Sequence, residues 1–308
     1  MAAKLMRKMA ILALVETVVG TAVVPLAANA MLVSDVTLTP IEGDVVERNN
    51  IRPFFGSSGS TLVTEYQKMA FSVELAGVAA AGDMPGVTDL LRACAMSATN
   101  QVGAKTVFAP VTDGIESVTI YGNVDGTLYK MHGARGEVDF STDAKAIPKW
   151  KFEFTGSFVP AVDAPLPAVD YSAFVAPLGV NKANTTLSVD GLSVACSAFS
   201  FKCGNQVVKR DLMNVDTVEI TDRKSTGSVT FENTTVAAKD WIGLARASAI
   251  VPIALKHGQG ATNTVSFKSA RAQVGKPTFS DSDGVQMVTI PLSFIPSDAG
   301  NDEWSIEI

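Results

Sequence analysis

The chain has 308 residues, of which 47% are apolar and only 7% aromatic, and its formal net charge is −6. This length suffices for one large domain or two of ordinary size. The acidic balance argues against a protein that grips nucleic acid, because phosphate contact needs clustered Lys and Arg. Beyond the N-terminus no stretch is long and apolar enough to span a bilayer, so we expect no membrane partner.

The N-terminal segment permits two interpretations. Basic residues precede an apolar run at 9–15, and Ala28-Asn29-Ala30 resembles a signal-peptide cleavage site. Against export, Glu16 lies in the middle of the segment, where a carboxylate is costly to place in hydrocarbon. The segment 1–30 is therefore either a cleaved signal or a retained N-terminal arm.

Alternation of apolar and polar residues predicts strands along most of the chain. The clearest are 150–155 and 288–294, where Pro291 indicates an edge or a bulge. Residues 118–131 predict a hairpin around Asn123-Val124-Asp125-Gly126. The fold class is therefore mainly β.

Two short helices are expected, at 87–96 and 237–247. Between them the sequence becomes rich in Pro, Ala and Val without clean periodicity, and we interpret 161–184 as a linker between domains.

The two sides of this linker resemble each other in four places that occur in the same order. The matched segments are 43–49 with 204–211, 71–75 with 227–231, 92–96 with 246–250, and 134–160 with 270–296. We interpret them as an internal duplication of strand, loop, strand, helix and strands. Coincidence among common β-rich tetrapeptides is the alternative. The duplication predicts two tandem domains, 31–160 and 185–308.

Residues that carry chemistry are scarce. His132 and His257 are the only histidines, and neither lies in a recognisable catalytic setting. The odd count of cysteines, Cys94, Cys196 and Cys203, mildly favours a reducing compartment. Cys196 and Cys203 could pair or bind a metal with His257, but small buried thiols are the simpler interpretation. We predict no catalytic, cofactor-binding or metal site, and hence no enzyme.

Several segments together resemble the major tail tube protein of long-tailed, non-contractile (siphovirus-type) bacteriophages. The resemblance runs nearly from end to end and no single motif in it carries chemistry. It rests on Glu16-Thr17 with Gly20-Thr21, Pro25 and 28–30, and on VTLTPIEGDVVERN (36–49), GARG (133–136), KWKFEFTGSF (149–158), ITDRKSTGSV (220–229) and IPSDAGNDEWSIEI (295–308). Because the pattern begins ahead of the apparent cleavage site, the resemblance implies that segment 1–30 is retained.

The resemblance implies a structural virion protein that polymerises as stacked rings into the tail tube. Each domain would be an antiparallel β-sandwich with a short flanking helix, contributing strands to a β-barrel between subunits. The implied partners are other copies of the chain, the tape-measure protein and the tail terminator and tip proteins. DNA would pass through the lumen without specific binding, and assembly would take place in the cytoplasm of the host bacterium.

Tubes of this family are commonly six-fold, so two tube domains per chain predict a ring of three chains with pseudo-six-fold symmetry. The competing arrangement is six chains with the second domain outside. The alternative function is an exported β-sandwich adhesin or fimbrial-type subunit with a cleaved signal peptide.

Two segments are the candidates for contacts between rings. The first is 49–66, whose shorter repeat equivalent is 212–226, and the second is the N-terminal arm 1–30, extended across a neighbouring subunit. Two adjacent phenylalanines in an otherwise polar loop suit a contact with another subunit, although they could also pack on their own sheet. The candidate residues are Arg52, Phe54, Phe55, Gly56, Gly59, Tyr66, Asp222, Arg223 and Lys224. We also expect a chain without residues 1–30 to stay soluble and fail to polymerise.

Overall fold

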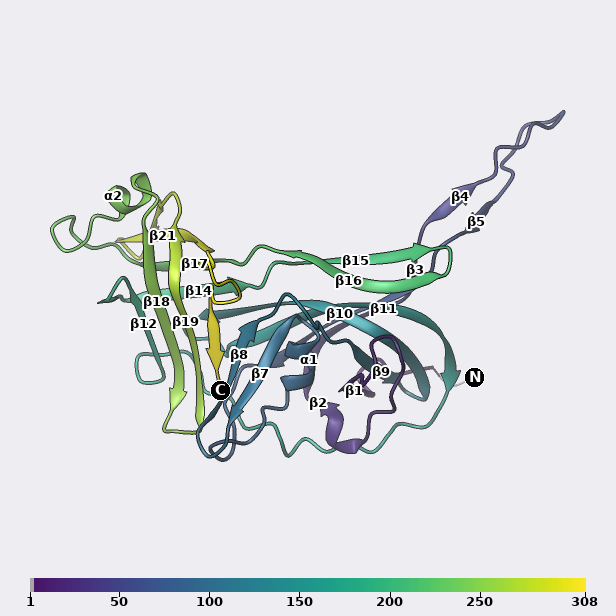
Figure 1. The fold of residues 1–308 in the computed structure, drawn as a ribbon, viewed down its shortest axis with the longest axis horizontal. Helices are drawn as coiled ribbons and strands as arrows, with labels where there is room; N and C mark the ends of the chain where they lie inside the picture. Colours follow the sequence, from purple (N-terminus) through teal and green to yellow (C-terminus); the bar gives the residue numbers. More distant parts are fainter. Residues whose placement is uncertain (1–2) are drawn as a thin grey trace.

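The computed structural model describes residues 3–308 and consists mainly of antiparallel β-strands with two short α-helices (Figure 1). The elements up to the linker are β1 (Met9–Val15), η1 (Ala27–Asn29), β2 (Ala30–Met31), β3 (Val33–Glu42), β4 (Val45–Glu47), β5 (Ser60–Leu62), β6 (Tyr66–Glu74), α1 (Thr88–Arg92), β7 (Met96–Gln101), β8 (Lys105–Pro110), β9 (Val118–Val124), β10 (Thr127–Asp143) and β11 (Lys149–Asp163). The elements after it are β12 (Thr185–Val189), β13 (Leu192–Ser193), β14 (Cys196–Lys202), β15 (Asn205–Leu212), β16 (Val215–Arg223), β17 (Thr226–Glu232), α2 (Trp241–Arg246), β18 (Ile250–Gln259), β19 (Asn263–Val274), β20 (Thr278–Ser282), β21 (Val285–Phe294) and β22 (Ser305–Glu307).

Four strands of the N-terminal half pair antiparallel in the order β3–β6–β11–β10. Val73 of β6 lies opposite Val33 on one side and Trp150 on the other. Trp150 in turn lies opposite Phe140 of β10. Because alternate side chains of a strand point to opposite faces, this row of large apolar residues enters the core, as the alternation at 150–155 predicts.

Four strands of the C-terminal half repeat this order as β14–β17–β21–β19. Val229 of β17 lies opposite Phe199 of β14 and Ile290 of β21. In each half a hairpin separates the first two strands of the row, and a short helix follows the second.

Pro291 lies in a strand with partners on both sides, so the edge interpretation is wrong, and its pairing with Ser228 shows no bulge. Its carbonyl accepts from Gly275 N at 2.8 Å, just where β19 ends and before β20 begins. The N–H and C=O of a strand residue point to the same side. The position where proline lacks an N–H is therefore on the side of the interruption between β19 and β20.

The two rows join through β10 and β14, where Phe140 lies opposite Phe201 and Asp139 opposite Lys202. Eight strands therefore follow one another in a single sheet. Phe140 also contacts the rings of Trp150, Phe199 and Phe267, with centroids 5.1–5.9 Å apart. One continuous cluster of buried apolar side chains spans both halves.

The helices are shorter than predicted. α1 covers five residues of the expected 87–96, and α2 covers six of the expected 237–247. Left-handed residues follow each of them, Ala95 with φ 60° and Ser248 with φ 49°, and this conformation does not continue a right-handed helix. Between Asp163 and Thr185 the chain forms no helix or strand, and β11 extends three residues into the predicted linker 161–184.

The N-terminal segment is part of the sheet rather than an arm directed away from it. All seven residues of β1 pair with β9, from Met9 opposite Val124 to Val15 opposite Val118. Ile11 and Leu12 are 1% and 2% exposed. Residues 1–2 of the expected arm lie outside the described residues.

Candidate assembly surfaces

Two long hairpins leave the eight-stranded sheet at equivalent places. The first contains β4 and β5 and connects β3 to β6, and the second contains β15 and β16 and connects β14 to β17. Each begins at a glycine against which the opposite strand packs closely. A Cβ on Gly43 would lie 1.9 Å from the carbonyl oxygen of Thr64, and one on Gly204 would lie 2.0 Å from that of Lys224. The match between 43–49 and 204–211 in the sequence thus marks the root of both hairpins.

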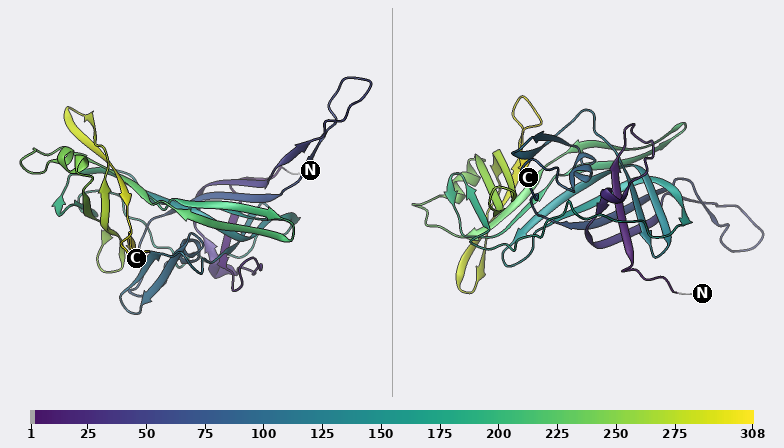
Figure 2. Two further views of the ribbon diagram at one scale, coloured as in Figure 1. Left: turned by 45° about the horizontal axis from the view of Figure 1, so that its top comes forward. Right: turned by 90° about the horizontal axis from the view of Figure 1, so that it is seen from below.

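The first hairpin projects far from the rest of the chain (Figures 1 and 2). Phe55 at its tip is fully exposed and Phe54 is 65% exposed, so neither packs on its own sheet. Arg52 lies over the Phe54 ring, 5.9 Å from the centroid. Gly59 has φ +81°, a conformation that other residues rarely adopt. Apart from Tyr66, which is half-buried at the start of β6, the candidates of this segment therefore gather at one exposed tip.

The second hairpin lies along β10 and β11 of the N-terminal half instead of projecting (Figure 1). Arg135 of β10 is 6% exposed and forms an ion pair with Glu219 of β16. It also donates to the carbonyl oxygens of Val218, at 2.8 Å, and of Ile115, at 2.7 Å. A single buried guanidinium thus holds the hairpin on the sheet with charge-assisted hydrogen bonds.

Glu137 fastens the root of the second hairpin. Its carboxylate accepts from the backbone N–H of Gly204 at 2.6 Å and of Asn205 at 2.5 Å. Burial raises the pKa of Glu137 to about 7, although these two hydrogen bonds act in the opposite direction. The tip of this hairpin exposes Leu212, Met213 and Val215. Those apolar residues between polar strands signal a contact surface, and we did not single them out from the sequence.

The three candidates at the end of β16, Asp222, Arg223 and Lys224, are in different environments. Arg223 is engaged within its own chain, where it donates to Glu303 at 2.8 Å, to the Val111 carbonyl at 2.9 Å and to Asn301 at 3.1 Å. Asp222 and Lys224 are exposed and lie 3.5 Å apart. The structure therefore does not bring these three residues together with the tip of the first hairpin.

The row of eight strands ends in β3 on one side and in β19 on the other. β19 pairs further with β18 and β22, and β20 continues along β21 where β19 ends. Within the residues described, the free edges are those of β3 and β20. β3 pairs with β6 alone, and β20 pairs with β21 alone. Exposed strand edges invite pairing with another chain. Phe279 of β20 and Leu32 beside β3 are 48% and 45% exposed, so apolar surface accompanies both edges.

The face of the sheet opposite the core is polar and mixed in charge around the junction of the halves. Asp139 lies opposite Lys151 on β11 and Lys202 on β14, and Ser141 lies opposite Ser200. Cations and carboxylates alternate here, so this patch does not form the basic stripe that would retain a phosphate backbone.

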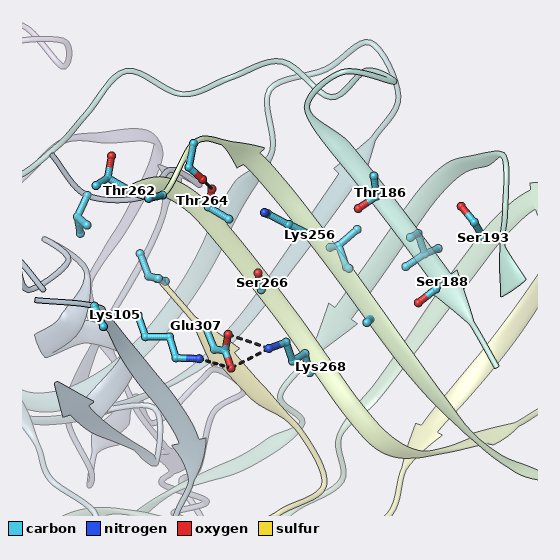
Figure 3. A pocket seen from close by; sticks show the side chains of 18 residues that line it. Lys105, Thr186, Ser188, Ser193, Lys256, Thr262, Thr264, Ser266, Lys268 and Glu307 are labelled. Carbon is cyan, nitrogen blue, oxygen red and sulfur yellow. Dashed lines mark hydrogen bonds and ion pairs between the residues drawn. The ribbon is translucent and has the colours of Figure 1, made fainter. Parts of the chain in front are cut away.

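A pocket of about 660 Å³ opens beside β22, between β18, β19 and the β7–β8 turn (Figure 3). The Glu307 carboxylate there forms ion pairs with the Nζ atoms of Lys105 and Lys268, each at an N···O distance of 2.9 Å. These ion pairs join β22 to strands of both halves. Within residues 3–308, no group of three or more His, Cys, Asp and Glu side chains could hold a metal ion. None of the helices in this range is long and apolar enough to cross a membrane.

The cysteines and His257 have structural surroundings. All three cysteines are free thiols, and burial raises the pKa of Cys196 to about 11. His257 is 2% exposed, its ring nitrogens lie 2.8 Å from the Thr185 hydroxyl and 3.0 Å from the Leu178 carbonyl, and burial lowers its pKa. The structure thus gives His257 hydrogen-bonding partners in the core and leaves the thiols unpaired.

A protein-family model described as phage tail tube protein matches residues 6–295. It therefore covers both halves, both hairpins and β1. No curated protein matches the chain.

Proposed function

The chain belongs to the phage tail tube protein family, and from this premise we propose that it polymerises as stacked rings into the tail tube through which genomic DNA is delivered. It is a structural virion protein, and its family is not an enzyme family. The observation that carries the proposal is the pair of free strand edges, β3 at one end of the sheet and β20 at the other. A ring consumes such edges between subunits, so the groups that invite pairing become the means of assembly.

Each ring is proposed to contain three chains. The strand order β3–β6–β11–β10 recurs as β14–β17–β21–β19, which supports two tandem tube domains at 31–160 and 185–308 joined by the linker 161–184. Three chains of eight strands give a barrel of twenty-four strands. At about 4.8 Å per strand its circumference is roughly 115 Å before strand tilt widens it. Pseudo-six-fold symmetry follows from the two domains of each chain.

The hairpin tips are proposed to connect successive rings. Arg52, Phe54, Phe55, Gly56 and Gly59 project on the first hairpin, and Leu212, Met213 and Val215 occupy the equivalent tip on the second. Exposed apolar side chains on projecting elements are typical of contact sites. Tyr66, Asp222 and Lys224 are candidates near the roots of the hairpins, and Arg223 fixes its neighbours through Glu303.

The polar face around Asp139, Lys151 and Lys202 is proposed to line the lumen. A wall of alternating charge does not attract a phosphate backbone strongly, so DNA can slide along it without specific binding. The further partners are the tape-measure protein inside the tube and the terminator and tip proteins at its ends. The protein would assemble in the host cytoplasm and function in the virion tail.

Electron microscopy of the purified protein at high concentration, with native mass spectrometry of solubilised rings, tests the proposal. We expect hollow tubes whose rings contain three chains. Rings of six chains with twelve tube-like domains would replace the three-chain arrangement but keep the function. Chains that remain monomeric at every concentration would contradict the proposed function itself.

A further inference from the structure

The contact between the two halves of one chain contains two features that recur, unpartnered, at the outer ends of the molecule. One is the pairing of β10 with β14, and the other is the second hairpin lying along β10 and β11. In the repeat, β14 corresponds to β3, and the second hairpin corresponds to the first. The long strand β10 corresponds to two shorter strands, the end of β19 followed by β20. β3 and β20 are the two free edges, and the first hairpin projects from the chain (Figure 2).

Arg271 gives independent evidence that something is missing from the second half. It follows Ala270 as Arg135 follows Ala134. In the ladders Gly136 pairs with Phe154 and Ala272 with Phe294, so Phe294 is the counterpart of Phe154, four residues away from the Phe158 to which the match of 134–160 with 270–296 assigns it. Arg135 is covered by the second hairpin, with which it forms a hydrogen bond and an ion pair. The Nε of Arg271 is buried without a hydrogen-bond partner within residues 3–308, and the residue as a whole is half-buried. Buried polar groups are normally satisfied, so this nitrogen indicates an absent partner.

We propose that the junction inside the chain is the template for the contact between neighbouring chains of one ring. The β20 edge of one copy pairs with the β3 edge of the next, and the stem of the next copy's first hairpin lies over Arg271. The proposal rests on the ring assembly proposed above and names the surfaces and register that close it. The stem thus contacts the same ring, while the tip with Phe54 and Phe55 remains free to reach the next one.

The register follows from the ladders. Inside the chain Ser141 pairs with Ser200, and Ser200 pairs with Ser228. Ser34 pairs with Ser72, the residue that matches Ser228 in the repeat.

On the other side of the junction, Ser141 pairs with Lys149, and the equivalent of Lys149 on β21 is Thr289, the partner of Thr278. Phe71 matches Gly227 in the repeat, and these two residues lie opposite Phe152 and Leu292 respectively. Phe152 therefore corresponds to Leu292, and three residues earlier Lys149 corresponds to Thr289. Thr278 of one copy therefore lies opposite Ser34 of the next, and Phe279 lies opposite Val33, which covers its exposed ring.

The stem of the first hairpin offers Arg271 an acceptor. Arg135 donates to the Val218 carbonyl of the second hairpin. The matched segments place Ser60 of the first hairpin where Val218 lies in the second, and Glu47 lies opposite Ser60. Arg271 would then donate to the Ser60 carbonyl of the neighbouring copy, with the Glu47 carboxylate beside it.

Disulfide cross-linking tests the register. In one chain Ser34 and Thr278 are separated by seven strand spacings along the sheet, roughly 34 Å, so the double variant S34C/T278C can form this disulfide only between chains. Directly opposite strand residues have the Cβ separation that a disulfide requires. On oxidation of assembled tubes we expect nearly all chains to become linked, in a ladder that ends at the number of chains per ring. The wild type gives the background from its own thiols.

The matched control is S34C/S280C, which is shifted by two residues and too far apart for the bond. Tubes in which the control cross-links and S34C/T278C does not would overturn the register. Tubes in which neither pair cross-links would overturn the edge pairing while leaving the tube function intact. Failure of the wild type to form any tube would instead count against the proposed function.

Substitution at the two equivalent arginines tests the hairpin contact. Arg271→Ala should leave the thermal unfolding of unassembled chains unchanged and raise the concentration needed for assembly about tenfold or more, the effect of losing a charge-assisted hydrogen bond. Arg135→Ala should lower the unfolding temperature, because its hairpin belongs to the same chain. Unchanged assembly of the Arg271 variant would overturn the hairpin contact.

Discussion

At the scale of single residues, Glu16 shows how the structure explains a charge that looks out of place in the sequence. In the sequence its charge interrupts an apolar run and argues against a signal peptide. In the structure it is 4% exposed, and its carboxylate accepts four hydrogen bonds, from Ser117 at 2.5 Å, Thr119 at 2.7 Å, Gly20 N at 2.8 Å and Gly133 N at 2.7 Å. The carboxylate joins the end of β1 to β9 and β10. Three of its four partners, Ser117, Thr119 and Gly133, come from distant segments, so the sequence could not indicate them.

Replacing Glu16 should destabilise the chain strongly. Glu16→Ala leaves the buried hydroxyls of Ser117 and Thr119 and the buried N–H of Gly133 without their acceptor. Each buried unpaired donor costs about 1–3 kcal/mol. We expect the free energy of unfolding of unassembled chains to fall by about 3 kcal/mol or more, as measured by urea denaturation followed by Trp fluorescence. The exposed Glu65→Ala is the matched control and should change it by less than about 0.5 kcal/mol. Equal stability of the two variants would refute the role given to Glu16.

At the scale of elements, the two hairpins have equivalent roots and different surroundings. One lies on its own chain through Arg135, and the other projects. The sequence predicts both as loops of a repeat, because the glycines and the residues after them match. It does not predict which one finds a partner inside the chain, since that depends on which half lies beside it.

The tip of the first hairpin should govern assembly without affecting the fold. In F54S/F55S both exposed rings are removed, so the unfolding temperature of unassembled chains should stay the same. Light scattering and electron microscopy should show separate rings or short stacks in place of long tubes, because apolar burial between rings is lost. Val102→Ser removes another almost fully exposed side chain, on the β7–β8 turn, and should assemble normally. Full-length tubes from F54S/F55S would exclude these phenylalanines from the ring contact.

At the scale of the whole molecule, the N-terminal segment decides between a tube subunit and an exported binding module. Cleavage after Ala30 would remove β1, which pairs with β9 over its full length and buries Ile11 and Leu12 in the core. Burial of each such side chain contributes about 1.5–3 kcal/mol, and the loss also opens the edge of β9. A typical protein has only about 5–15 kcal/mol of net stability.

A chain that begins at residue 31 should therefore fail to fold, which replaces our expectation from the sequence that it stays soluble. We expect aggregation on expression and no cooperative unfolding transition by circular dichroism. A chain that lacks only residues 1–4 should fold and assemble normally, since Lys4 makes a single long, exposed ion pair of 3.9 Å. A well-folded, monomeric 31–308 chain would favour the exported adhesin or fimbrial alternative.

The sequence by itself determined the mainly β class, the strands at 150–155 and 288–294, the positions of both helices and the landmarks at the hairpin roots, the second strands and the helices of the two halves. These features depend on local periodicity, on turn residues and on comparison of the chain with itself, all of which are written along the chain. The match of 157–160 with 293–296 is displaced by four residues in the ladders. Only the tertiary structure decided that β1 belongs to the sheet, that Glu16 has three buried donors from distant segments, that Arg223 is occupied within its own chain and that Arg271 lacks the cover that Arg135 has. Each of these depends on contacts between residues far apart in sequence, and strand periodicity gives the face of a side chain without giving the strand that lies beside it.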